Sequence, residues 1–458
     1  MKNFLIITQV FSPDPAAVGQ YFDEAAQAIA GTGAQVTVLT ANRGYDNPKE
    51  KFAAKEACNG IQIRRLPLSS FGKAIIPLRI FAQLSFLIQC ILRGLFTPHL
   101  TDLLVSTSPP MAAITAVVIG FFRPKLKVHY WVMDINPDQS IILGAFGPRH
   151  PLVLALDWLN RRILKRADSV MALDRFMAAR MIAKLTEKTG DKGQRTEIRV
   201  QKAVNLSADE PPVINHPQLR NGITIIPPWP MDDYLESVPH SENLFRKEQG
   251  WEGKFVVMYS GNHSLVHPLD TILDAAEALK DDDRFVFAFI GGGKGKQAIE
   301  DQIQRLEARG QKSALNHSTT QPLNLRSLPY QPLDQIRYSL SAADLHIVSL
   351  GDNMSGIVHP CKIYGALSIG RPVLALGPNQ SYLNDIIDGN DIGRSIEHGD
   401  VDATVAALQA AAEQTQEERV AIGQRAQQVA TEKFSREQLV HQFLETVLKA
   451  ENISQASP

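Results

Sequence analysis

Short apolar runs of strand length alternate along most of the chain with longer stretches whose apolar residues recur at helical spacing. The run at 3–11 is apolar almost throughout, as a parallel strand covered on both faces requires. A helical pattern and a second strand-like run follow it, and this order makes a βαβ unit. Further strands are predicted at 61–67, 102–110, 125–134 and 168–174. The first ~200 residues are therefore predicted to form a doubly wound parallel sheet.

A polar stretch separates this series from a second one of the same kind. Residues 188–221 show no clean periodicity and predict a surface insertion or a mobile excursion of the chain. Strand-like runs return at 222–230, 254–263, 285–293, 325–332 and 345–350, with helical patterns between several of them, and a further such run ends the stretch 351–378. We expect an α/β protein with two Rossmann-like domains, 1–215 and 222–432, facing each other across a cleft lined by the carboxyl ends of both sheets. A last helix, predicted at 433–458, could pack across both domains.

Composition limits the class of protein. A length of 458 residues exceeds one ordinary domain. Lys and Arg number 47 and Asp and Glu 48, and this balance gives no support to nucleic-acid binding. The widely spaced Cys58, Cys90 and Cys361 form no CxxC pair, which disfavours a disulfide framework or structural zinc site and favours a reducing compartment. The first residues lack the length and cleavage site of a signal peptide, so we expect a cytoplasmic protein.

The segment Ile80–Phe96 is the most apolar helical pattern in the chain. Gln83, Ser85 and Gln89 interrupt it, so we expect no membrane-spanning helix. Two interpretations remain open on the pattern alone. An apolar helix with basic residues just upstream is typical of a helix that lies on a membrane surface. A buried core helix with a narrow polar stripe has the same pattern.

The glycines of "FIGGGKGKQ" do not form a nucleotide P-loop. Ile290 stands where the motif needs glycine, and Gln297 stands where it needs serine or threonine. No GxGxxG follows the first strand, which disfavours a nicotinamide or flavin enzyme. Three glycines just past a strand, Gly292 among them, still permit close backbone approach, either for a ligand or for a plain tight turn.

Two further stretches place polar residues immediately after predicted strands. In "YSGNHSLVHPLD", Gly261, Asn262 and His263 predict an anion or sugar contact. A zinc pair of His263 and His267 is disfavoured, because proline follows and no third ligand is near. In "YWVMDINPDQS", Asp134 and Asn136 either face the cleft or form an Asx turn that caps the next helix.

The stretch "HPCKIYG" combines three side chains with binding chemistry. A thiol nucleophile at Cys361 needs a lowered pKa and a general base, and Pro360 stiffens its spacing from His359. Lys362 and the amides at the start of the following helix make a better anion site. We therefore favour anion binding over thiol or metal chemistry here.

These residues together resemble a known family. The pattern GxxPxKxYGxLxxGxPV, from Gly356 to Val373, resembles the donor-binding segment of family 4 glycosyltransferases, which have the GT-B fold. The segments "GNHS", "HPLDT", "LPYQPL", "SAADLH", "GIVHPCKIY" and "WVMDINPD" are similar to a bacterial subgroup resembling transferases that build envelope polysaccharides on lipid carriers. The resemblance covers most of the chain except Lys188–Asn221.

The resemblance implies roles for individual residues. Asp134 would face the reacting sugar and Lys362 would neutralise the leaving diphosphate, so these two are the expected catalytic residues. The remaining implied contacts are Gly19, His359 and Ile363 at the diphosphate, Gly261, Asn262, His263 and Gly292 at phosphate or sugar, Leu328 and Tyr330 at the nucleobase, and Asn136 and Ser106 on the acceptor side. No metal or other cofactor is expected, since preorganised cations and amides can stabilise the leaving group.

One departure from the family pattern concerns ribose binding. Many members carry two glutamates separated by seven residues, where this chain has Ile357 and Gly365. The second glutamate normally holds the ribose, and Asp352 is a conceivable substitute.

The resemblance implies transfer of a sugar from a nucleotide diphosphate sugar, most simply a UDP-sugar, to an acceptor hydroxyl, with retention of configuration. The acceptor would be a lipid-linked or envelope saccharide, and Ile80–Phe96 would contact the inner face of the cytoplasmic membrane. The alternatives are a sugar-nucleotide epimerase of the same fold and a non-catalytic partner that binds sugar nucleotides.

Overall fold

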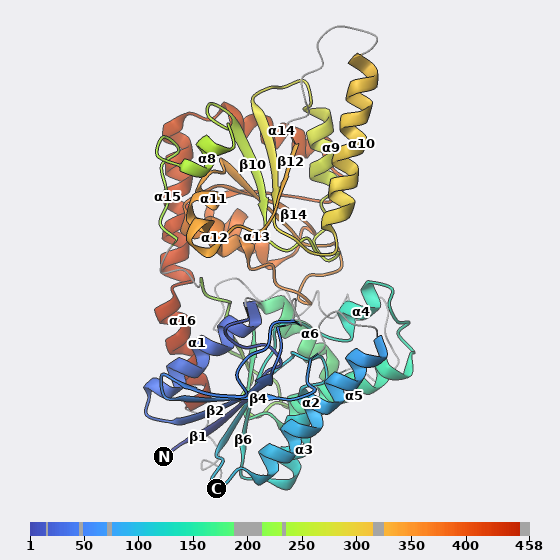
Figure 1. Cartoon of the computed structure of the whole chain (residues 1–458), viewed down its shortest axis with the longest axis vertical. Helices are drawn as coiled ribbons and strands as arrows, with labels where there is room; N and C mark the ends of the chain where they lie inside the picture. Colours follow the sequence, from blue (N-terminus) through green and yellow to red (C-terminus); the bar gives the residue numbers. More distant parts are fainter. Residues whose placement is uncertain are drawn as a thin grey trace. The chain divides into compact units, whose positions relative to one another are not determined.

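The structure is a computed structural model that describes residues 1–448 apart from 15–16, 45–48, 71–75, 187–212, 231–234 and 315–324. The chain divides into two compact units, each built on its own sheet (Figure 1). The first unit comprises the chain up to Pro228, the short segment Gly356–His359 and the helix α16 (Arg436–Leu448). The second comprises Trp229–Ser355 and Pro360–Ser435.

The first sheet is parallel apart from its two edge strands. Its described strands lie in the order β3-β4-β2-β1-β5-β6-β7-β9-β8. They are β1 (Asn3–Ile7), β2 (Gln35–Ala41), β3 (Lys55–Cys58), β4 (Ile61–Leu66), β5 (Asp102–Ser106), β6 (Lys127–Trp131), β7 (Ser169–Ala172), β8 (Val213–Ile214) and β9 (Ile223–Ile225). β3 and β8 run antiparallel to their neighbours. The central strands are buried along nearly their whole length, which is why they appear in the sequence as continuous apolar runs.

Helices cover both faces of the first sheet. Those described are α1 (Ala17–Gly31), α2 (Ile76–Phe96), α3 (Ala113–Phe122), α4 (Asp138–Ile142), α5 (Pro151–Arg166), α6 (Arg175–Thr186) and α16. Figure 1 shows α1 and α16 on one side of the sheet and α2, α3 and α5 on the other. α16 packs through Phe443, whose ring centroid lies 5.0 Å from that of Trp131.

The second sheet is wholly parallel, with the order β12-β11-β10-β13-β14-β15. Its strands are β10 (Phe255–Ser260), β11 (Phe285–Ile290), β12 (Leu325–Leu328), β13 (Leu345–Ser349), β14 (Val373–Leu376) and β15 (Gly393–Ile396). The accompanying helices are α8 (Leu244–Glu248), α9 (Asp270–Ala278), α10 (Lys296–Ala314), η1 (Leu333–Gln335), α11 (Ile336–Ser341), α12 (Lys362–Ser368), α13 (Tyr382–Ile387), η2 (Asp388–Asn390), α14 (Val401–Glu413) and α15 (Gln416–Lys433). A core of Phe, Ile and Leu side chains fills the space between β10, β11 and their helices.

The fold class predicted from the apolar runs is confirmed, with differences at its edges. β3, β8 and β15 are not predicted by the pattern, and α10 continues past the expected end at Gly310. Most of the predicted insertion at 188–221 lies outside the described residues. The last predicted helix corresponds to α16, and positions 449–458 are likewise outside the description. α15 and α16 are separate because the chain leaves helical geometry at Phe434, whose ring packs 5.0 Å from Tyr364.

The segment Ile80–Phe96 lies in α2. Within the described chain, Pro77–Phe96 is the one helical stretch long and apolar enough to cross a membrane, with a mean hydropathy of 1.4, and 28% of it is buried in the protein. A row of its apolar side chains from Ile80 to Phe96 is exposed, so the interpretation as a buried core helix is wrong.

Candidate functional site

The loops that follow β10 and β11 meet around the side chain of Lys362 in the second unit. A Cβ added to Gly261 would lie 2.6 Å from Lys362 Cε, and one added to Gly293 would lie 2.1 Å from Asn262 Oδ1. Both glycines have positive φ, of 136° and 123°, which L side chains rarely adopt. The backbone therefore approaches the lysine and the amide this closely only because no side chain intervenes.

His263 lies in the same loop and is almost fully buried. Its backbone N–H donates to Gly292 O at 2.7 Å, and its Nδ1 lies 3.3 Å from the same oxygen. Burial lowers the pKa of His263, and the nearby ammonium groups of Lys296 and Lys362 add to this, so the imidazole is neutral at pH 7. A proton on Nδ1 leaves Nε2 as an acceptor, and Nε2 has no hydrogen-bond partner within the described chain. The Nε2 atom of His263 can therefore accept a hydrogen bond from a ligand hydroxyl.

Lys362 is a partly buried cation at the centre of this cluster. Its Nζ lies 5.3 Å from the centroid of the Tyr259 ring. Burial lowers its pKa from 10.5 to about 8, and no acidic residue in the described chain offsets this. A buried ammonium group without a carboxylate partner is costly, and a bound anion would remove that cost. The site is therefore suited to a phosphate or diphosphate.

The end of β12 adds an aromatic side chain to the cluster. Tyr330 is 58% exposed, and a Cβ added to Gly292 would lie 2.9 Å from its Cε2 atom. The Tyr330 hydroxyl donates to Gly292 O at 3.4 Å. Lys296, to which the sequence assigned no role, donates to Gly291 O and Leu328 O at 2.8 and 2.9 Å. These two bonds join the carboxyl ends of β11 and β12 and hold Leu328 and Tyr330 beside the glycine loop.

Among the described residues, none within 4 Å of a Cβ added to Gly365 is acidic. A Cβ added there would make ordinary contact with Leu340 and Leu235, at 3.4 and 3.9 Å. Ile363, in the same helix α12, has a fully buried side chain, so only its main chain could meet a donor. Asp352 is exposed in the loop that follows β13. A nucleotide bound here would have to be held differently from the glutamate-dependent pattern of the family.

The segment Gly356–His359 belongs to the first unit, although the residues on both sides belong to the second. His359 Nδ1 lies 2.8 Å from Asp174 Oδ2, and the other oxygen of Asp174 accepts from Met177 N at 2.7 Å. Ile357 O accepts from Ile135 N at 3.0 Å. The Nδ1 atom of His359 is thus engaged by a carboxylate of the first unit and is not free for a phosphate.

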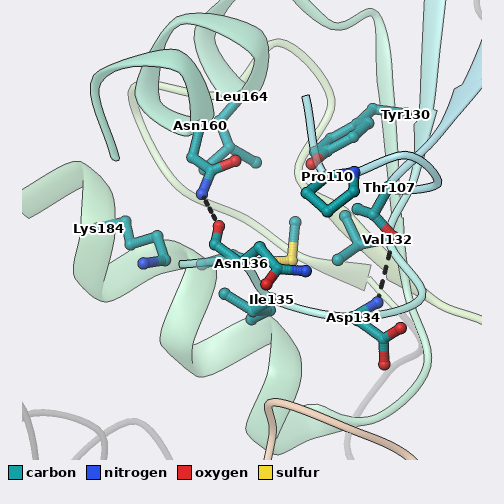
Figure 2. Close-up of a pocket in the computed structure, with 11 residues that line it drawn as sticks. Thr107, Pro110, Tyr130, Val132, Asp134, Ile135, Asn136, Asn160, Leu164 and Lys184 are labelled. Atoms are coloured by element: carbon teal, nitrogen blue, oxygen red, sulfur yellow. Dashed lines mark hydrogen bonds between the residues drawn. The ribbon is translucent and has the colours of Figure 1, made fainter. Parts of the chain in front are cut away.

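Asp134 follows β6 beside a small cavity in the first unit (Figure 2). The backbone N–H groups of Met133 and Asp134 each donate to Thr107 Oγ1 at 3.2 Å, which fixes the turn. Figure 2 shows the carboxylate pointing away from the cavity. Burial raises the pKa of Asp134 from 3.8 to about 6. The carboxylate is therefore ionised at pH 7 but becomes protonated only slightly below it.

The wall of this cavity is fixed by polar contacts. Asn136 O accepts from Asn160 Nδ2 at 2.6 Å (Figure 2), and Ser140 Oγ donates to Asn136 Oδ1 at 3.5 Å. The ammonium group of Lys184 contacts both Asp138 and Asp157. Asn136 is therefore held mainly through its backbone carbonyl. The Asx-turn alternative is supported by the 3.5 Å contact from Ser140 to its side chain.

Two other predicted residues have structural contacts. Gly19 lies in the first turns of α1, where a Cβ would come within 3.1 Å of Phe11 N, so the glycine lets the helix pack on the chain that follows β1. Ser106 is buried at the end of β5, and its Oγ both donates to and accepts from the backbone of Ser108 at 3.0 Å. Ser106 therefore braces the turn that carries Thr107.

The sequence did not single out Thr107 and Asp174. Thr107 follows β5 and Asp174 follows β7, and both β5 and β7 are neighbours of β6 in the sheet. Because the carboxyl ends of parallel strands meet at one edge, their position one or two residues past a predicted strand was the signal available.

Comparisons with known proteins agree with this architecture. Residues 16–189 match the family model described as a glycosyl transferase 4-like domain. The chain is 25% identical over 306 residues to the probable glycosyltransferase WbjE of Pseudomonas aeruginosa, a match that covers 63% of this chain and 60% of that protein. It is 24% identical over 416 residues to the putative colanic acid biosynthesis glycosyl transferase WcaI of Escherichia coli K12, covering 88% and 90%.

Solved structures show the same fold. Anabaena Alr3699/HepE in complex with UDP-glucose superposes with a TM-score of 0.63 at 14% identity, covering 98% of this chain and all of that one. WaaG, a glycosyltransferase involved in lipopolysaccharide biosynthesis, gives a TM-score of 0.61 at 15% identity, covering 97% and 99%. The chain thus has the GT-B fold of these solved proteins, and its residues 16–189 match a glycosyl transferase 4-like domain.

Proposed function

We propose that the protein transfers a sugar from a UDP-sugar to an acceptor hydroxyl, with its donor diphosphate at Lys362. The observation that carries this proposal is the partly buried Lys362 side chain, which lies against a glycine loop with no acidic partner in the described chain. The solved relative in complex with UDP-glucose supports UDP as the nucleotide. Tyr330, exposed beside Gly292, is the proposed border of the base.

The chemistry requires stabilisation of the leaving nucleotide. Breaking the sugar–phosphate bond builds negative charge on the diphosphate, and a preorganised cation in a poorly hydrated site stabilises that charge most in the transition state. Lys362 supplies such a cation, and we propose that no metal is needed. His263 Nε2 would accept a hydrogen bond from a hydroxyl of the donor sugar.

Asp134 is the proposed residue on the sugar side of the reaction. Its carboxylate accepts no hydrogen bond from the described chain that would quench its charge, while its backbone is fixed by Thr107. An ionised carboxylate can stabilise the positive charge that develops on the sugar ring. Retention of configuration is the proposed outcome, on the basis of the family resemblance.

The proposed acceptor is a lipid-linked or envelope saccharide. The name of the Escherichia coli relative, a putative colanic acid biosynthesis transferase, supports this class. We further propose that the enzyme works in the cytoplasm at the inner face of the membrane, with Ile80–Phe96 in contact with lipid.

Titration with UDP, GDP and ADP, followed by assays with UDP-sugars in the presence and absence of acceptor, tests the function. We expect UDP to bind most tightly and Lys362→Ala to lower kcat/KM by roughly 100-fold or more. Lys280→Ala, which removes an exposed lysine at the end of α9, is the matched control and should leave kcat/KM unchanged. Failure of all three nucleotides to bind would contradict the proposal.

The same assays separate the alternatives. An epimerase would convert the donor sugar without any acceptor. A non-catalytic partner, which Ile357 and Gly365 motivate, would bind UDP without turnover.

A further inference from the structure

The outward face of α2 carries a continuous apolar stripe. Ile80, Leu84, Ile88, Leu92 and Phe96 recur every four residues and are between 47% and 80% exposed. The opposite face of the same helix is buried, with Ala82, Phe86, Leu87 and Cys90 almost without solvent contact. One face of α2 thus belongs to the core, and a helix fixed in this way lies along the protein surface with its apolar stripe uncovered.

The stripe continues onto α3. A Cβ added to Gly94 would lie 2.4 Å from Ile119 Cδ1, so the glycine lets α2 and α3 pack closely. Arg123, just after α3, donates to Gly94 O and Thr97 O at 2.9 and 2.7 Å and ties the ends of the two helices together. Phe121 and Phe122, at the end of α3, are 78% and 65% exposed. Because the ends of the two helices are tied together, these aromatic side chains add to the apolar surface at the Phe96 end of α2.

α5 extends the same layer on the other side of α3. A Cβ added to Gly120 would lie 2.8 Å from Arg166 Nε, which shows how closely these helices approach. Trp158 is 51% exposed, and the Arg162 guanidinium lies 5.2 Å from the centroid of its ring. Before α5, the chain exposes Leu143 and Phe146. Figure 1 shows α2, α3 and α5 together on one side of the first sheet.

The exposed charged side chains of this layer are basic in the described chain. Between Glu56 and Asp134 the sequence holds eight Lys and Arg residues and a single acid, Asp102, which is buried. Between Asp138 and Asp168 it holds five Lys and Arg residues and again one acid, the buried Asp157. Of these basic residues, Arg65, Lys127 and Arg166 are paired with Glu56 or Asp168. The exposed ones in α2, beside α3 and around α5 are Arg79, Lys125, Arg149, Arg162 and Lys165.

We propose that the outer faces of α2 and α3, together with the α4–α5 segment, form one docking surface for a bilayer that contains anionic lipid. Exposed aliphatic and aromatic side chains rimmed by Arg and Lys match the boundary between acyl chains and anionic headgroups. A second copy of the chain fits worse, because an isologous interface would place the two basic rims against each other.

The surface has a consequence for the acceptor. Asn160 lines the cavity beside Asp134, while Trp158, two residues earlier in α5, lies on the docking surface. The helix that borders the cavity would therefore rest on the bilayer, so an acceptor carried by lipid could reach it. This consequence rests on the proposed function, whereas the evidence for docking does not.

Co-sedimentation with vesicles tests the proposal. The wild-type protein is expected to bind vesicles of phosphatidylcholine with phosphatidylglycerol, and to bind those of phosphatidylcholine alone more weakly. Ile88→Ser and Trp158→Ser should each lower binding by roughly tenfold. The pair Arg162→Glu and Lys165→Glu should abolish the preference for anionic lipid. Leu244→Ser and Lys247→Glu, at exposed positions of α8 in the second unit, are the matched controls and should change nothing.

Four results would overturn the proposal. These are no binding of the wild type, equal binding by all variants, resistance to extraction by salt and alkaline carbonate (which indicates a spanning helix), and a dimer that the same substitutions dissociate. An unchanged circular dichroism spectrum and an unchanged urea transition of the first unit show that the fold of each variant is intact. A variant that loses vesicle binding and still binds UDP tests the docking surface alone. A protein that binds vesicles and does not bind UDP contradicts the proposed donor site and leaves the docking surface supported.

Discussion

Replacing Asp134 by asparagine is expected to remove transfer activity and at the same time to stabilise the first unit at neutral pH. Burial raises the pKa of this carboxyl from 3.8 to about 6. The folded protein therefore binds the proton more tightly than the unfolded chain does. The free energy of unfolding accordingly falls as pH rises from about 4 through about 6, and the full cost is present above that range.

The magnitude follows from the shift. The rise in the pKa of Asp134 corresponds to about 3 kcal/mol at most. We expect about 1–3 kcal/mol after the side chain and solvent relax. Asparagine has the same shape and no charge, and the structure gives the carboxylate no hydrogen bond that an amide would break. Asp134→Asn should therefore recover this free energy above pH 6 and make almost no difference near pH 4.

Urea denaturation at pH 7.5 and pH 4.5, followed by tryptophan fluorescence, measures the effect. The two units can unfold separately, so the transition that Asp134→Asn shifts should be fitted on its own. A variant that is no more stable than the wild type at pH 7.5 would refute the inferred cost of burying the charge. A gain of equal size at both pH values would refute its electrostatic origin.

Three further substitutions probe the same sites. Gly261→Ala should weaken UDP binding by roughly tenfold or more in calorimetric titration, because its Cβ would displace Lys362; Gly250→Ala, which also has positive φ but open space around it, should keep the wild-type affinity. Asp174→Ala should lower the free energy of unfolding by about 2–3 kcal/mol in urea denaturation, because His359 and Met177 N both lose a partner, and an unchanged midpoint would contradict this. Lys184→Met should cost about 3–5 kcal/mol in the same measurement, since two partly or fully buried carboxylates lose their cation, and a loss below about 1 kcal/mol would show that they are solvated.

Much of the fold could be predicted because buried parallel strands are continuous apolar runs, and nearly every such run is a strand of one of the two sheets. The edge strands β3 and β8 could not be predicted in this way, because they are not continuous apolar runs of strand length. β3 is exposed along its whole length, and β8 has only two residues. A pattern that detects burial on both faces does not detect strands of this kind.

The cluster in the second unit was predictable for a related reason. Gly261, His263 and Gly292 all lie just past strands that are neighbours in the sheet, and the topology brings such positions together. The pKa of Lys362 was not predictable, because it depends on burial by loops distant in sequence. His359 shows the limit most clearly. Its partner, Asp174, is 185 positions away and belongs to the first unit, whereas the motif around His359 suggested a phosphate contact.

The sequence also could not predict which face of α2 is buried and which is exposed. Its residues are apolar almost all round, so the pattern does not tell which face packs on the core and which stays uncovered. Only the packing of α2 on α3 shows that the stripe from Ile80 to Phe96 is the uncovered face.

Calorimetric titration of UDP at pH 7 and pH 9 tests the central claim, that the charged form of Lys362 binds the donor diphosphate. With a pKa of about 8 in the free protein, the ammonium fraction falls about tenfold between these values. The wild-type affinity for UDP should therefore fall by up to about tenfold, while Lys362→Met should bind weakly and equally at both. Unchanged affinity of the wild type across this range, or Lys362→Met binding as tightly as the wild type at pH 7, would contradict the claim.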